Sequence, residues 1–206
     1  VTGTPYDTIQ GVIGIGSGSA GSLKEFGISY EQVELKKDGT PDLEAIKNTV
    51  TNHYRMIYIQ RSRGYSLRPS LSVREIAEII DICKRKAPDC IVMVDNCYGE
   101  FVEQEEPVCY GADIMAGSLI KNPGGGIAPT GGYIAGRADL VEKCGGRFSA
   151  PGVGAEVGCT GDMLRQLALG LYFAPGVTAD ALKTSVYATA LFPPLGLADT
   201  PAWDAD

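Results

Sequence analysis

Apolar residues recur at helical spacing most clearly in residues 71–86. Six small or apolar side chains fall on one face of this segment, and Ser70 or Ser72 stands where an N-cap belongs. Residues 41–50 show a shorter version of the same pattern. The pattern predicts a helix in each segment. The apolar face of the longer helix consists of Val73, Ile76, Ala77, Ile79, Ile80 and Cys83.

Short continuous apolar runs predict the strands. Residues 55–60 and 90–94 have the composition of buried strands, and residues 112–116 and 133–135 are expected to form further short strands. Strands that alternate with amphipathic helices are typical of a layered α/β fold with a largely parallel sheet. We therefore expect functional side chains at the carboxyl ends of the strands.

The C-terminal part of the chain is expected to contain two helices separated by a break. Residues 145–160 are rich in glycine and predict a loop, whereas residues 162–173 return to helical spacing. Pro175 followed by Gly176 predicts a break, after which residues 178–192 predict a linking helix.

This break divides the chain into two expected parts. Residues 1–176 are expected to belong to a large domain, and residues 177–206 to hold the linking helix and the beginning of a small domain. The chain starts with Val1 and ends in a polar segment, so we expect it to be an excerpt of a longer polypeptide.

Composition and charge disfavour several classes of function. A formal net charge of −7 and a pI near 4.8 disfavour nucleic-acid binding. No apolar run approaches the roughly 20 residues that span a bilayer, and without a signal peptide the expected location is the cytoplasm. The six cysteines form no C-x-x-C pair and His53 is the only histidine, so neither a metal site nor a histidine-based triad is expected.

One group of residues carries candidate chemistry. Asp95 follows the apolar run of residues 90–94, Tyr98 stands three positions later, and Lys121 lies in a mostly neutral segment that leads into glycines. Pyridoxal phosphate requires an amine for a Schiff base, an acid for the ring nitrogen and hydroxyls for its oxygens. The residues alone leave two interpretations open: such a site, or a strand-end aspartate that caps a loop and a surface lysine.

Four segments, in the same order along the chain, resemble one known family. They resemble the aluminium-resistance, methionine gamma-lyase-like proteins, which belong to the fold-type-I pyridoxal-phosphate enzymes and are related to the cystathionine synthases and lyases. The resemblance implies a three-layer α/β sandwich with a mostly parallel sheet, of which this chain forms part of the large cofactor-binding domain. The four segments are residues 3–8, 21–28, 94–101 and 118–126.

The resemblance also assigns roles to single residues. It implies that Lys121 forms the internal aldimine with pyridoxal 5'-phosphate and that Asp95 pairs with the pyridinium nitrogen. Ser118 matches a serine that contacts the cofactor phosphate, and Tyr98 matches a tyrosine that bonds the ring hydroxyl in some relatives. Asn96, next to Asp95, is included as a further cofactor contact.

The implied activity is that of a carbon–sulfur lyase, of the methionine gamma-lyase or cystathionine lyase type, acting on a sulfur-containing amino acid in a homodimer or homotetramer. An aminotransferase and a non-catalytic protein that retains the fold are the alternatives, because one cofactor serves several reactions. Family members are considerably longer, and their phosphate loop and ring-stacking aromatic residue precede the matching region. The glycine-rich residues 124–132 and 145–158 are expected to approach a neighbouring subunit or the cofactor closely.

Two arginines and a glycine motif lead to further predictions. Arg61 and Arg63 follow the strand at residues 55–60 and are candidates to bind a substrate carboxylate or cofactor oxygens in bidentate geometry, with a solvated loop as the alternative. Residues 16–21 satisfy G-x-G-x-x-G, but residues 22–26 are too short for the crossover helix of a dinucleotide-binding unit. A flexible loop is therefore expected there.

Overall fold

The structure is a computed structural model that describes residues 1–16, 20–150, 152–154, 156, 158 and 160–197. Several features of the sequence lie partly or wholly outside the described residues. These are the glycine motif at residues 16–21, the loop expected at residues 145–160, Cys159, and the end of the small-domain segment at residues 198–206.

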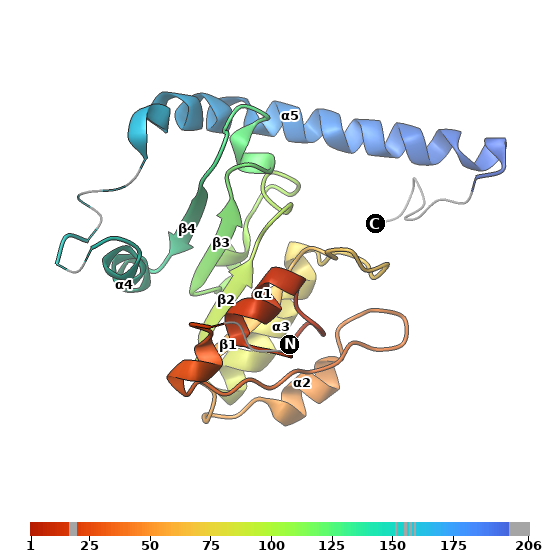
Figure 1. The fold of residues 1–206 in the computed structure, drawn as a ribbon. Helices are drawn as coiled ribbons and strands as arrows, with labels where there is room; N and C mark the ends of the chain where they lie inside the picture. Colours follow the sequence, from red (N-terminus) through yellow and green to blue (C-terminus); the bar gives the residue numbers. More distant parts are fainter. Residues whose placement is uncertain (17–19, 151, 155, 157, 159, 198–206) are drawn as a thin grey trace.

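The sheet has four strands and is mostly parallel. Strands β1 (Met56–Gln60), β2 (Ile91–Asp95), β3 (Ile114–Ser118) and β4 (Gly132–Gly136) lie side by side in chain order (Figure 1). The first three are parallel, and β4 runs antiparallel to β3. The predicted α/β class and mostly parallel sheet are thereby confirmed.

Helices α2 (Leu43–Thr49) and α3 (Val73–Lys86) share one hydrophobic core with β1 and β2. A capping box begins α3: the Ser72 hydroxyl accepts a hydrogen bond from the Glu75 amide, and the Glu75 carboxylate accepts one from the Ser72 amide. Alternate strand residues point into this core. Its fully buried members include Ile46, Ile59, Ile76, Ile79, Cys83, Val92 and Val94.

Three helices differ from the sequence pattern. Helix α1 (Asp7–Ile13) is not evident from that pattern, because none of its residues is buried. Helix α4 (Ala138–Phe148) extends into the segment that was expected to be a loop. Helix α5 (Leu164–Leu191) continues through Pro175, so the predicted break is wrong, and the expected domain boundary falls inside a helix.

Short 3-10 helices lie between and after the longer elements of the described residues. They are η1 (Leu23–Phe26), η2 (Pro107–Tyr110), η3 (Asn122–Gly124), η4 (Gly161–Met163) and η5 (Pro193–Leu195).

Packing explains why α5 continues through a proline. An interior proline removes a backbone hydrogen bond and costs about 3 kcal/mol. Gly170, Ala174 and Thr178 are buried at four-residue spacing, so the buried stripe extends across Pro175, and its first two members lie against the turn that η3 begins. Within the described segments, no helix is both long enough and apolar enough to cross a membrane.

A buried carboxylate joins three elements at the start of β3. Asp113 accepts hydrogen bonds from Lys84 Nζ of α3 at 2.5 Å, from the Val92 amide of β2 at 2.7 Å and from Arg137 Nη1 at 3.1 Å. Burial alone would raise the pKa of the Asp113 carboxyl, but these donors outweigh it and hold the pKa below its ordinary value.

We expect Asp113 to make folding stability depend on pH. A carboxyl whose pKa is lower in the folded state contributes its full stability above the ordinary aspartate pKa of about 3.9, and this contribution is lost as the pH falls through the folded-state pKa. Asp113→Asn should therefore be less stable at neutral pH, by about 1–3 kcal/mol, and should lose less stability in acid than the wild type. Urea unfolding of the full-length protein, followed from neutral to about pH 3, measures both effects. Equal acid sensitivity of the two proteins would contradict this role.

Candidate active site

A pocket of about 230 Å³ lies at the carboxyl ends of the parallel strands. Asp95 is the last residue of β2, and Lys121 and Tyr98 belong to the loops that follow β3 and β2. This is the sheet edge at which open α/β folds bind ligands. The structure therefore brings together three of the residues singled out from the sequence. The lining consists of Tyr6, Ser62, Gly64, Tyr65, Asp95, Cys97, Tyr98 and Lys121.

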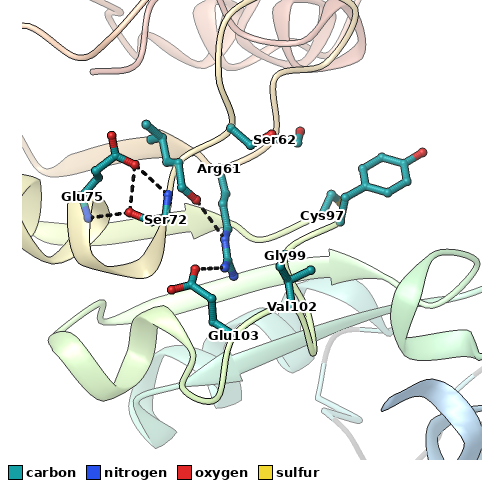
Figure 2. Close-up of a pocket in the computed structure, with 11 residues that line it drawn as sticks. Arg61, Ser62, Ser72, Glu75, Cys97, Gly99, Val102 and Glu103 are labelled. Atoms are coloured by element: carbon teal, nitrogen blue, oxygen red, sulfur yellow. Dashed lines mark hydrogen bonds and ion pairs between the residues drawn. The ribbon is translucent and has the colours of Figure 1, made fainter. Parts of the chain in front are cut away.

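A larger, open groove of about 640 Å³ adjoins this pocket. The two share Ser62, Cys97 and Tyr98, and the groove extends past Arg61 to the start of α3 at Ser72 (Figure 2). Cys97 and Tyr98 thus form the boundary between the pocket and the groove.

Two donors hold the Asp95 carboxylate in place. Its Oδ2 accepts a hydrogen bond from the Tyr58 hydroxyl at 3.0 Å, and its Oδ1 accepts one from the Cys97 amide at 3.1 Å. Burial, together with the charge of Asp95, raises the pKa of Tyr58 far above its ordinary value, so the phenol remains a neutral donor. Sequence reasoning missed Tyr58. The sequence signal that could have identified it is a tyrosine in β1, the strand that pairs with the Asp95 strand β2.

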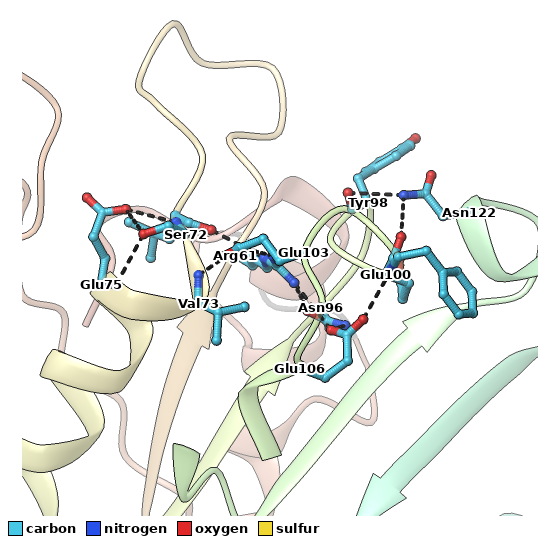
Figure 3. Close-up of polar contacts among 12 residues, drawn as sticks. Arg61, Ser72, Val73, Glu75, Asn96, Tyr98, Glu100, Glu103, Glu106 and Asn122 are labelled. Atoms are coloured by element: carbon cyan, nitrogen blue, oxygen red, sulfur yellow. Dashed lines mark hydrogen bonds and ion pairs between the residues drawn. The ribbon is translucent and has the colours of Figure 1, made fainter. Parts of the chain in front are cut away.

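The loop that follows β2 holds Lys121 in place. Its Nζ lies 4.3 Å from the centroid of the Tyr98 ring, which is the distance of a cation–π contact. The side-chain amide of the next residue, Asn122, donates to the Tyr98 carbonyl at 3.2 Å and to the Glu100 carbonyl at 3.0 Å (Figure 3). These bonds join the lysine turn to the loop that carries Tyr98.

Tyr98 has a strained backbone conformation. Its φ is +68°, and Phe101, three residues later, has φ of +62°. For bulky residues this left-handed region costs about 1–3 kcal/mol and persists where the surroundings impose it, often at functional sites. Between them, a Cβ on Gly99 would lie 2.3 Å from Arg61 Nη1, so only glycine fits there. Close packing against Arg61 thus shapes the loop that holds the Tyr98 ring beside Lys121.

Arg61 is part of the scaffold. Its residue is 3% exposed, and its Nη2 donates to Glu103 at 2.6 Å while its Nη1 donates to Asn96 at 2.8 Å (Figures 2 and 3). The guanidinium also contacts Glu106 at 3.3 Å and the Leu71 carbonyl at 3.2 Å. These bonds occupy donors on both sides of the guanidinium, so a substrate carboxylate would have to displace one of them, and the substrate-binding role of Arg61 stays a prediction.

Arg63 lies on the loop beyond β1 and is half-buried. Of the two predicted substrate-binding arginines, Arg63 is therefore the one that we test first.

Asn96 also has a structural position. It is fully buried, and its Nδ2 donates to Glu106 at 2.8 Å and to the Tyr133 hydroxyl at 3.3 Å. Because successive residues of an extended chain point to opposite faces, Asn96 points away from the pocket that Asp95 lines. Asn96 therefore does not line this pocket, and its contact with a cofactor stays a prediction.

Ser118 and Cys97 occupy the two neighbouring loop starts. Ser118 ends β3 and is half-buried, and its carbonyl accepts a hydrogen bond from the Lys121 amide at 3.2 Å. The contact of Ser118 with a phosphate remains a prediction.

Burial, with the charge of Asp95, raises the pKa of the Cys97 thiol to about 11, which keeps the thiol protonated and weakly nucleophilic at neutral pH. The described residues contain no group of three His, Cys, Asp or Glu side chains arranged to hold a metal ion.

The fold and the pocket define an α/β protein whose polar groups converge at the carboxyl edge of parallel strands. The chain belongs to the methionine gamma-lyase family, whose model matches residues 1–206.

Relatives of known sequence and structure agree with this assignment. YnbB of Bacillus subtilis is 47% identical over 206 residues, which make up 100% of this chain and 49% of YnbB. A carbon–sulfur lyase involved in aluminum resistance from Clostridium novyi is 46% identical, with a TM-score of 0.93, over 100% of this chain and 49% of that one. A Listeria innocua protein, provisionally named a cystathionine beta-lyase involved in aluminum resistance, is 49% identical, with a TM-score of 0.96, over 100% of this chain and 50% of that one. The chain spans about half the length of these relatives.

We expect the two neighbouring arginines to respond differently to truncation. Arg61→Ala would leave buried Asn96, half-buried Glu106 and the exposed Glu103 carboxylate without their partner and should destabilise the full-length protein by about 1–3 kcal/mol. Arg63→Ala should change stability by no more than about 0.5 kcal/mol and should raise the KM for an amino-acid substrate. Urea unfolding and steady-state kinetics distinguish the two roles. A stable Arg61→Ala protein with a raised KM would identify Arg61 as the substrate-binding residue.

Proposed function

We propose that the full-length protein is a pyridoxal-phosphate-dependent carbon–sulfur lyase that acts on a sulfur-containing amino acid, and that Lys121 is the residue that holds the cofactor. The observation that carries the proposal is that Lys121 and Asp95 line one pocket at the carboxyl edge of the sheet. Membership of the methionine gamma-lyase family and the name of the Clostridium novyi relative support the reaction class.

The donor set of the pocket suits this cofactor. Lys121 offers a primary amine for the covalent link, and Asp95 offers a carboxylate for the ring nitrogen. Tyr98 would contact the ring hydroxyl, and Ser118 the phosphate. When pyridoxal phosphate is bound, negative charge at the alpha carbon of the substrate is stabilised by its ring.

The protein's own groups then perform the proton chemistry. Lys121 Nζ accepts the alpha proton of the amino acid as general base. The Asp95 carboxylate keeps the proton on the ring nitrogen, and because Tyr58 and the Cys97 amide fix both of its oxygens, little reorganisation is needed during the reaction. The Tyr98 ring covers one side of the lysine amine.

The family also supplies the architecture that we propose for the whole protein. We propose that this chain is part of the large domain of a fold-type-I enzyme, a three-layer sandwich, and that α5 leads to the small domain. The working unit would be a homodimer or a homotetramer.

Replacing Lys121 should remove the covalent cofactor link. Borohydride treatment of the full-length wild type, followed by peptide mass spectrometry, should place the reduced pyridoxyl group on Lys121, and Lys121→Ala should carry none. Lys143→Ala is the matched control, because Lys143 is exposed on α4 and should keep the wild-type label. A label on Lys143 would contradict the assignment.

Replacing Asp95 should separate binding from turnover. Asp95→Asn should retain bound cofactor but lower kcat by on the order of 100-fold to 1,000-fold, because a neutral amide cannot hold the ring nitrogen protonated. Release of thiol and ammonia measures the lyase reaction, and exposed Asp89→Asn serves as the control. A wild-type rate for Asp95→Asn would show that Asp95 does not face the ring, and pyridoxamine phosphate in place of thiol and ammonia would indicate a transaminase.

A further inference from the structure

We propose that Gly170 of α5 is a positioning residue for Lys121, because helix α5 holds the turn that carries the lysine by direct contact between backbones. The importance of Lys121 in this inference rests on the proposed function, but the contact itself can be tested without the cofactor.

The contact leaves no room for a side chain on either partner. A Cβ on Gly170 would lie 2.3 Å from the Gly124 carbonyl oxygen, and a Cβ on Gly125 would lie 2.4 Å from the Gly170 carbonyl oxygen. Real Cβ atoms do not approach heavy atoms this closely, so an added methyl group would force the backbones apart. Gly124, Gly125 and Gly170 are all buried.

The turn transmits this contact to Lys121 over a short and constrained path. The Gly124 amide donates to the Lys121 carbonyl at 3.0 Å, and Gly125 adopts φ of +54°. A Cβ on Gly124 would lie 1.8 Å from the Leu119 carbonyl oxygen, so the turn is also packed tightly against the residues before the lysine. A displacement of Gly124 must therefore displace the lysine backbone.

Lys121 is thus held from two sides. On one side, the Asn122 amide joins the turn to the Tyr98 loop (Figure 3). On the other, Gly124 and Gly125 lie against α5, which crosses the sheet at the end where the turn lies (Figure 1). If the contact with α5 moved while the Asn122 contact stayed in place, the Lys121 amine would change its position relative to Asp95.

Helix α5 offers a matched control for the contact. Gly176 lies on the same helix, is exposed, and would place a Cβ with nothing within 4 Å. Glycine weakens a helix relative to alanine at both positions. Gly170→Ala and Gly176→Ala are therefore the same chemical change, with and without the backbone collision.

The test measures Lys121 in the cofactor-free, full-length protein and turnover in the loaded protein. The acetylation rate of Lys121, relative to that of Lys143 in the same molecule, should change in Gly170→Ala and stay at the wild-type ratio in Gly176→Ala. Because unfolding would expose half-buried Lys121 more than Lys143, which is already exposed, the ratio is measured under conditions in which urea unfolding shows each variant to be folded, and a change then reports position. In the loaded protein, kcat should fall by on the order of 100-fold in Gly170→Ala, as expected for a displacement of about 1 Å, and stay within about twofold in Gly176→Ala.

A milder pair keeps the test decisive if Gly170→Ala does not fold. Ala174→Gly removes a fully buried methyl group beside Gly125, whereas Ala181→Gly makes the same change at an exposed position of α5. The acetylation rate of Lys121 relative to that of Lys143 should change in Ala174→Gly and stay at the wild-type value in Ala181→Gly. A wild-type ratio in both Gly170→Ala and Ala174→Gly would overturn the inference, whereas absence of the cofactor from wild-type Lys121 would overturn the proposed function alone.

Discussion

The buried guanidinium of Arg61 is the group on which the pocket depends. It lies directly after β1 and binds three side chains from the segment that follows β2, namely Asn96, Glu103 and Glu106. A charge removed from water is tolerated only when its hydrogen bonds are satisfied, so this segment must close around the guanidinium. The closure brings Gly99 against Arg61 and leaves Tyr98 in its left-handed conformation. The position of the aromatic ring beside Lys121 is therefore determined by a residue that does not line the smaller pocket.

Local patterns were sufficient to predict most of the fold. The strands β1, β2 and β3 and the helices α2 and α3 start within two residues of the segments that periodicity and apolar runs indicate. The prediction failed where tertiary packing outweighs a local signal. Pro175 would end an isolated helix, yet α5 continues because Gly170 and Ala174 pack against a turn that is distant in the sequence.

The candidate site was predictable to the extent that strand ends determine it. Asp95, Tyr98 and Lys121 meet because parallel strands end at one edge. The direction of single side chains was not predictable from residue type alone: Asn96 and Arg61 have the chemistry of ligand-binding groups but point into the scaffold. The glycines after Lys121 were expected to approach a neighbouring subunit or the cofactor, whereas Gly124 and Gly125 lie against α5 of the same chain.

Helix α5 also determines when the lysine turn can take its final shape. Gly170 follows Gly124 by 46 residues, so the ribosome completes the turn well before it makes the backbone that supports it. The Arg61–Glu106 contact spans 45 residues, so the entropy of loop closure is nearly the same for both contacts, and the order of synthesis decides which can form first. During synthesis, β1 to β3 and the Arg61 network can assemble first, with the Lys121 turn supported only through Asn122. The amine would therefore reach its working position only as the last step in the folding of this part of the chain.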